Sequence, residues 1–194
     1  MSSTTTTDTV DHILDGAMRA LGRHGSARPS MTEICREAGV SRGTLYRYFA
    51  NLDEVLEAVN SRILAVNREL FQEAIAAHPA PEDRVRVVLH TMLDFPSVFP
   101  HMKLLFEYEP KASVEFLTRE AETVVAAIAE YLRPGVPKSR GRNALSAEDL
   151  AALLYRVVTA SFLMPTRSVQ DVEDMFMRLW VAADPTTKGT TRHT

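Results

Sequence analysis

Arginine, threonine and tyrosine side chains gather in one short segment, where they could bind a nucleic acid. Arg42, Thr44, Arg47 and Tyr48 lie within seven consecutive residues. An arginine guanidinium can donate two hydrogen bonds to O6 and N7 of guanine, which discriminates against other bases by about 1–3 kcal/mol. A threonine can contact a thymine methyl group or a phosphate, and a tyrosine can contact the phosphate backbone. These residue types therefore predict that Arg42 and Arg47 read bases in a DNA groove.

Two short helices joined by a tight turn would position these side chains. Ser30 can cap a first helix, and Glu33, three residues later, completes a capping box. Gly39 can end that helix in the left-handed conformation, and Ser41 can cap the second helix. Residues 30–49 are therefore predicted to form a helix-turn-helix, a motif whose second helix enters the DNA major groove.

Four further residues of this segment belong to the expected DNA-binding surface. Ser30 and Thr32 would place hydroxyl groups and free N–H groups of the first helix where a phosphate can bind. Gly43 would let the backbone approach the duplex closely. Tyr46 could contact a phosphate or pack in the core, and the sequence leaves both open. For Arg47 the alternative to base contact is a surface salt bridge.

The run from Gly43 to Phe49, Gly-Thr-Leu-Tyr-Arg-Tyr-Phe, resembles the signature of tetracycline-repressor (TetR) type regulators. The resemblance covers residues 8–64, and the rest of the chain is similar to that family only in length and helical pattern. It implies a homodimer that binds a palindromic operator in double-stranded DNA, most often as a repressor released by a small effector. One departure is Leu52, where the family usually has a lysine that contacts a phosphate. Leu52 could instead pack in the core.

The hydrophobic spacing is helical throughout, which predicts an all-α fold of about nine helices. We expect a disordered tail at residues 1–7, a DNA-binding domain at 8–64, an effector-binding and dimerisation domain at 65–183, and a second disordered tail at 184–194. A helix from about Asn51 to His78 is too long for the first domain alone. It is therefore expected to join the two domains.

Charge and cysteine content agree with this organisation. The chain of 194 residues has a net charge of −3, yet residues 16–50 contain six arginines and only two glutamates, a local balance of +4. A basic segment on an acidic chain suits a protein that binds DNA through one end. The single cysteine, Cys35, excludes an internal disulfide, and no apolar run is long enough to span a membrane. We therefore expect a cytoplasmic protein.

Two amphipathic helices near the end of the chain, beginning at Ser146 and Ser168, suggest a four-helix dimer interface. Burial within a single chain would explain the same pattern. The candidate interface residues are Leu153, Val157, Val172, Met175, Phe176, Leu179 and Trp180.

Methionine and phenylalanine are dense in the middle of the chain, around a helix expected at residues 97–108. Such side chains can line an adaptable pocket for a lipophilic effector, and no other cofactor is predicted. An ordinary hydrophobic core explains them equally well. The candidate ligand-binding residues are Met92, Phe95, Phe99, Met102, Phe106 and Phe116.

A metal-dependent enzyme and a helical interaction module are the two alternatives to a DNA-binding regulator. A metal-dependent enzyme could use His90, Asp94, His101, Glu107 and Glu109 as ligands, but these lack the spacing of known zinc motifs, and no Ser/His/Asp arrangement is evident. We therefore predict neither a catalytic nor a metal site. A helical interaction module would lack affinity for DNA, and the local charge of +4 argues against it.

Overall fold

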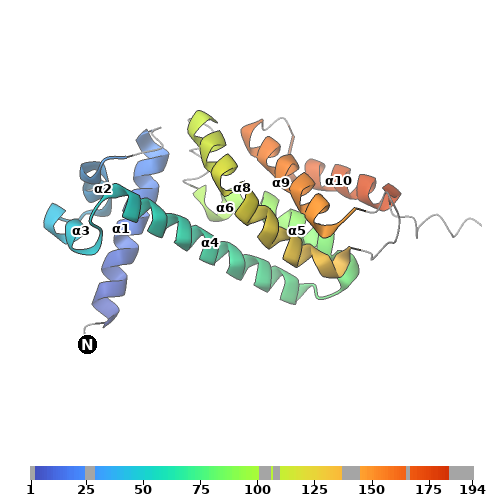
Figure 1. The fold of residues 1–194 in the computed structure, drawn as a ribbon, viewed down its shortest axis with the longest axis horizontal. Coiled ribbons are helices and arrows are strands. Elements are labelled where there is room, and N and C mark those ends of the chain that lie inside the picture. The colour runs from blue at the N-terminus through green and yellow to red at the C-terminus, as the bar shows by residue number, and fades with distance from the viewer. Residues whose placement is uncertain are drawn as a thin grey trace, which may run out of the picture. The chain divides into compact units, whose positions relative to one another are not determined.

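The computed structural model describes residues 3–24, 29–100, 106, 110–136, 145–164 and 167–183 (Figure 1). Within these ranges the secondary structure consists of nine α-helices and two short 3₁₀ helices, which confirms the all-α prediction. The chain divides into two compact units. The first contains Met1–Gln72 and Phe95–Glu120, and the second contains Glu73–Asp94 and Ala121–Thr194.

The first unit begins with α1 (Ser3–His24), which packs against α2 (Met31–Ala38). A Cβ atom built on Gly16 would lie 2.5 Å from Cβ of Ala38, so only glycine permits this close approach. Arg19 of α1 also donates a hydrogen bond to the backbone oxygen of Glu37 in α2 at 2.5 Å. These contacts hold α2 firmly on α1.

The turn between α2 and α3 (Arg42–Tyr48) follows the predicted capping pattern. The Ser30 hydroxyl accepts from the Glu33 N–H, and the Glu33 carboxylate accepts from the Ser30 N–H, which forms the capping box. Gly39 adopts the left-handed conformation with φ of 67°, and Ser41 caps α3 by accepting from the Thr44 N–H. All three local predictions are confirmed.

The long helix α4 (Leu52–Ala77) follows directly and is continuous in Figure 1. Asn51 caps it by accepting from the Glu54 N–H at 3.0 Å. In the first unit Arg62 of α4 forms an ion pair with Asp15 of α1 at 2.9 Å, and Asn60 donates to Glu120 at 3.3 Å. These contacts tie α4 to both α1 and α8.

Of the remaining helices, α5, α9 and α10 belong to the second unit, α6 belongs to the first, and α8 runs from the first unit into the second. Helix α5 lies at its centre, contacts both α9 and α10, and buries Val85, Val88 and Leu89 completely or nearly so. The bounds of these elements are η1 (Pro81–Asp83), α5 (Arg84–Leu93), α6 (Phe95–Val98), α8 (Pro110–Leu132), η2 (Arg133–Gly135), α9 (Ala147–Leu163) and α10 (Val169–Ala183).

Some predicted boundaries differ from the structure. Helix α1 begins at Ser3, so the expectation of a disordered tail over residues 1–7 was wrong for most of that segment. The first compact unit extends along α4 to Gln72, eight residues beyond the expected domain boundary at residue 64. The tail predicted at 184–194 and most of the helix predicted at 97–108 lie outside the described residues.

No helix in the described ranges combines the length and the apolar character needed to cross a membrane.

Candidate DNA-binding surface, dimer face and polar groove

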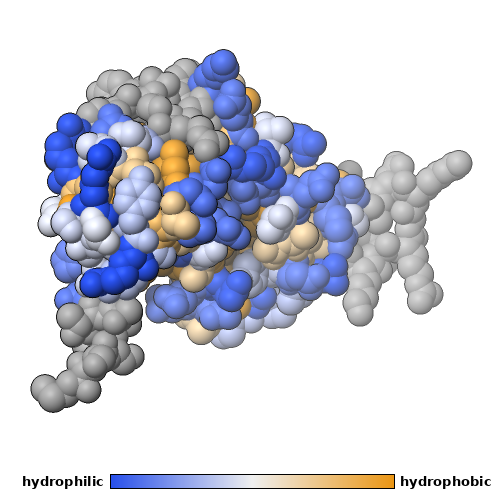
Figure 2. Space-filling model, turned by 60° about the vertical axis from the view of Figure 1, so that its left-hand side comes forward, coloured by the Kyte–Doolittle hydropathy of each residue, from blue (hydrophilic) through white to orange (hydrophobic). Residues whose placement is uncertain are grey.

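Helix α3 separates its residues sharply between the core and the solvent. Leu45 is fully buried and Phe49, its C-cap, is nearly so. Arg42, Gly43 and Arg47 are exposed on the other side. Figure 2 brings this part of the molecule forward and shows hydrophilic side chains projecting from it. The helix is therefore anchored by its apolar side and presents a polar side to a partner.

Tyr46 belongs to the exposed side of α3. It is 51% exposed, so the alternative that it packs in the core is wrong. Its phenol ring is accessible to a phosphate, which the interpretation of Tyr46 as a DNA contact requires.

Hydrogen bonds hold the beginning of α3 against the beginning of α2. Nη2 of Arg42 donates to Oγ1 of Thr32 at 2.5 Å. The hydroxyl groups of Ser41 and Thr44 lie 2.9 Å apart and share a hydrogen bond. Two hydrogen-bonded pairs, Arg42–Thr32 and Ser41–Thr44, therefore make up the surface cluster at the beginning of α3. A preorganised cluster loses less side-chain entropy when it binds.

The end of α3 carries a second cluster, formed by two neighbouring residues. Nη2 of Arg47 donates to the hydroxyl oxygen of Tyr48 at 3.2 Å. The guanidinium carbon also lies 4.9 Å from the centre of the Tyr48 ring, a cation–π distance. Among the described residues Arg47 forms no ion pair, so the surface salt bridge considered for it is absent there.

Ser30 and Thr32, which were predicted to contact phosphates, already form hydrogen bonds within the protein. The N–H group of Ser30 is not free, because it donates to the Glu33 carboxylate at 2.6 Å. The exposed hydroxyl of Thr32 accepts from Arg42 and lies in the surface cluster. Leu52, the first residue of α4, is half-buried, so its side chain is partly in the core and partly accessible.

The local excess of arginine is only partly available to a partner. Arg19 is used between α1 and α2, and Arg36 pairs with Glu37 at 3.7 Å. Arg42 and Arg47 contact only neutral side chains in the described structure, so their charges remain uncompensated. Among the arginines of this segment whose side chains the structure describes, Arg42 and Arg47 of α3 are therefore the exposed ones that contact only neutral groups.

Comparison with known proteins agrees with this geometry. Residues 13–59 match the family model described as bacterial regulatory proteins, tetR family. BetI, an HTH-type transcriptional regulator of Agrobacterium fabrum, is 33% identical over 82 residues, which are 40% of this chain and 38% of BetI. An HTH-type transcriptional regulator of Mycobacterium tuberculosis is 29% identical over 167 residues, which are 85% of this chain and 80% of that protein.

The helix-turn-helix region of this chain, residues 13–59, belongs to the TetR family of bacterial regulatory proteins.

Solved structures show the same fold over nearly the whole length of this chain. A protein from Rhodococcus sp. that is assigned to the TetR family superposes with a TM-score of 0.67 at 19% identity, over 91% of this chain and 98% of that one. The fatty acid degradation regulator FadR from Bacillus halodurans gives a TM-score of 0.63 at 17% identity, over 96% and 97%.

Helices α9 and α10 carry exposed apolar side chains. Leu153 of α9 and Met175 and Leu179 of α10 are exposed, and Leu179 reaches 66% exposure. Val157 and Trp180 are half-buried. An exposed apolar face on neighbouring helices is typical of a surface that another chain covers.

Two residues predicted for that interface lie elsewhere. Val172 and Phe176 are only 8% and 7% exposed in the single chain, so they belong to the core of the second unit. Helix α10 therefore has two apolar sides. One side packs on α5 within the second unit, and the other side faces solvent.

The residues predicted to line a lipophilic pocket do not line a common cavity in the described structure. Met92 belongs to the second unit, whereas Phe95, Phe99, Phe106 and Phe116 belong to the first. Phe95 and Phe99 pack against each other with ring centres 4.9 Å apart, and Met92, Phe99 and Phe106 are buried. Met92, Phe99 and Phe106 are therefore core residues, Phe95 and Phe116 are half-buried, and Met102 lies outside the described residues.

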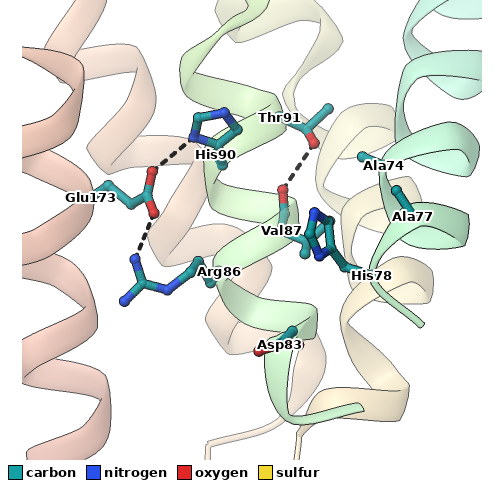
Figure 3. Close-up of a pocket in the computed structure, with 9 residues that line it drawn as sticks. All are labelled: Ala74, Ala77, His78, Asp83, Arg86, Val87, His90, Thr91 and Glu173. Carbon is teal, nitrogen blue, oxygen red and sulfur yellow. Dashed lines mark hydrogen bonds and ion pairs between the residues drawn. The ribbon is translucent and has the colours of Figure 1, made fainter. Parts of the chain in front are cut away.

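A cavity of about 490 Å³ occurs instead in the second unit (Figure 3). It lies along α5, with the end of α4 on one side and Glu173 of α10 on the other. None of the six predicted ligand residues lines it. The cavity is lined by Ala74, Ala77, His78, Asp83, Arg86, Val87, His90, Thr91 and Glu173.

His90, one of the residues considered as a metal ligand, forms a hydrogen bond with Glu173. Its Nδ1 lies 2.8 Å from Oε2 of Glu173, and because a carboxylate only accepts, the imidazole donates this hydrogen bond. No group of three histidine, cysteine, aspartate or glutamate residues suited to a metal ion occurs in the described parts of the chain. The other ligands considered, His101, Glu107 and Glu109, lie outside them.

Proposed function

We propose that this chain is a dimeric repressor that binds a palindromic operator through α3 and releases it when a small effector binds. The observation that carries the proposal is the division of α3 between Leu45 and Phe49 in the core and Arg42 and Arg47 on the surface. No carboxylate among the described residues pairs with either arginine. Two arginines so placed can each donate a fork of hydrogen bonds to guanine.

Dimerisation follows from the size of this surface. The recognition helix has only seven residues, so one copy can contact few base edges. Two copies joined by the exposed face of α9 and α10 would bind two half-sites, and the symmetry of the protein would require an inverted repeat. Leu153, Met175 and Leu179 are the residues that we assign to this dimer face.

The route from effector to DNA is helix α4. It begins at Leu52, four residues after the end of α3 at Tyr48, and continues without a break to Ala77 beside the cavity. An effector that binds more tightly to one arrangement of α4 would shift the population away from the DNA-binding state, a coupling of typically 1–3 kcal/mol. That the effector is lipophilic stays a prediction.

A regulator is favoured over an enzyme because the relatives are transcriptional regulators. We also place the protein in the cytoplasm, where a bacterial regulator meets the chromosome.

Two measurements test this proposal. Double-stranded DNA fragments selected from a random pool by the purified chain should share an inverted repeat, with half-sites about one helical turn or a small multiple apart. Sedimentation of the protein on one such fragment should give two copies, or a multiple of two, per duplex. A pool without an enriched sequence, or a single copy on each duplex, would contradict the proposal.

A further inference from the structure

The cavity of the second unit is built around one buried acid. Glu173 of α10 is only 4% exposed. Its Oε1 accepts from Nη1 of Arg86 at 2.8 Å, and its Oε2 accepts from Nδ1 of His90 at 2.8 Å. Figure 3 shows the carboxylate between these two side chains of α5. A buried carboxylate is tolerated when it is paired and hydrogen-bonded in this way.

The two partners of Glu173 are much more accessible than the acid itself. The side chains of Arg86 and His90 are 48% and 59% exposed. Arg86 uses Nη1 for Glu173, and its other N–H groups form no hydrogen bond in the described structure. Nη1 of Arg86 also lies 4.0 Å from Oδ1 of the half-exposed Asp174. The side of the cavity next to α10 therefore presents the remaining hydrogen-bond donors of Arg86, with Glu173 behind them and Asp174 beside them.

The opposite side of the cavity is mostly apolar. Ala74 and Ala77 come from the end of α4, and Val87 comes from α5 between them and the arginine. His78 adds a second imidazole on this side. The only exposed acid in the lining is Asp83, in η1 before the first turn of α5. A ligand that fits has an acidic head and an apolar body.

We propose that this cavity binds a small amphipathic carboxylic acid. If the chain is an effector-controlled regulator, as proposed above, this acid is its effector. Its carboxylate accepts from the unused N–H groups of Arg86, and its apolar body covers Ala74, Ala77 and Val87. The volume of about 490 Å³ lies within the usual range for small-molecule sites.

This position gives the acid a means of control. It contacts α5 and the end of α4, and it competes with Glu173 for the guanidinium of Arg86. Glu173 belongs to α10, the helix that carries Met175 and Leu179 of the proposed dimer face. The ligand thus acts on α4, which begins next to the recognition helix, and on the helix through which we expect the two copies to associate.

The test is calorimetric titration of the full-length protein with 4-phenylbutyrate and with octanoate, each beside its neutral amide. Both acids should bind at least about tenfold more tightly than their amides, because a charge-assisted hydrogen bond is lost in the amide. Arg86→Gln should remove this difference. Arg133→Gln is the matched control, since Arg133 is also a half-exposed arginine paired with a glutamate, Glu148, but does not line the cavity.

Arg86→Gln leaves Glu173 with one partner and could disturb folding. The double variant Arg86→Gln/Glu173→Gln removes both charges and keeps a neutral hydrogen-bonding pair, and it should likewise bind acid and amide equally. Equal affinity of acids and amides for the wild-type protein, or a preference for the acids that survives in a folded double variant, would overturn the proposed site.

A DNA-binding assay separates the site from the regulatory role. Addition of either acid should release the selected DNA from the wild-type protein and not from the double variant. Acid binding without DNA release would overturn the effector role, although the site would stand. A protein that binds no specific DNA at all would contradict the proposed function, and the calorimetric result on the site would be unaffected.

Discussion

Replacing Gly43 by alanine should raise the stability of the protein while it weakens DNA binding. Gly43 is exposed in the first turn of α3, and the nearest atom to an added Cβ is Oγ of Ser41 at 3.8 Å, an ordinary van der Waals distance. The methyl group therefore fits in the free protein. Alanine loses less backbone entropy than glycine on folding, so the free energy of unfolding should rise by about 0.5–1 kcal/mol.

On DNA the same methyl group should be harmful. If the backbone of α3 approaches the duplex at Gly43, the added atom overpacks the interface at a cost of about 1–3 kcal/mol, which is roughly a fivefold to hundredfold increase in Kd. Urea unfolding measures the first effect, and fluorescence anisotropy with labelled operator measures the second. A stabilised protein with an unchanged Kd would refute the close approach.

Gly39→Ala is the contrasting control for this experiment. Gly39 has φ of 67°, a conformation that strains other residues, yet no atom lies within 4 Å of an added Cβ. This variant should lose roughly 1 kcal/mol of stability. Its DNA affinity, corrected for the folded fraction, should fall less than that of Gly43→Ala.

Three further outcomes are expected. Leu52→Lys should steepen the slope of log affinity against log salt by up to about two units for a dimer, at about 0.9 for each phosphate contact; an unchanged slope with lower thermal stability would make Leu52 a core residue. Leu179→Glu should shift sedimentation from dimer to monomer without loss of helix content, because Leu179 is 66% exposed. Hydrogen bonds from the side chain and backbone of Ser146 lower the pKa of Asp149. The hydrogen bonds between Ser146 and Asp149 therefore stabilise α9 fully at pH values above the ordinary carboxyl pKa, and this stabilisation is lost as the pH falls through the lowered pKa of Asp149. Ser146→Ala should raise the pKa of Asp149 in an NMR titration.

Local features of this fold could be predicted from the sequence because their causes are local. The capping box of Ser30 and Glu33, the left-handed Gly39 and the cap at Ser41 each involve residues within a few positions. The exposed and buried sides of α3 follow from the helical spacing of Leu45 and Phe49. These features were sufficient to identify the surface that we propose binds DNA.

The division between core and interface on α10 could not be predicted in the same way. Phe176 and Leu179 are both apolar, and they lie three residues apart on one helix, yet one is buried and the other is exposed. Hydropathy describes a side chain but not the neighbour that covers it. Only the position of α10 in the second unit shows that Val172 and Phe176 face inward.

The cavity could not be predicted from the sequence for a related reason. Arg86 and Glu173 are 87 positions apart in the chain, and no local spacing connects them. The available signal was the charge of Glu173, an acid between the apolar residues Val172 and Phe176 on the inner side of α10. The methionine and phenylalanine cluster was instead a general sign of a core, and it is shared between the two units.

Selection of binding sites from random DNA with single variants of α3 tests the central claim most directly. Arg42→Ala and Arg47→Ala should each lose base preference at particular positions of the half-site, because base contacts specify the sequence. Tyr48→Phe should weaken binding to all sequences nearly alike and keep the preference. If both arginine variants select the same sequence as the wild-type protein, α3 does not read DNA in the way that its geometry indicates.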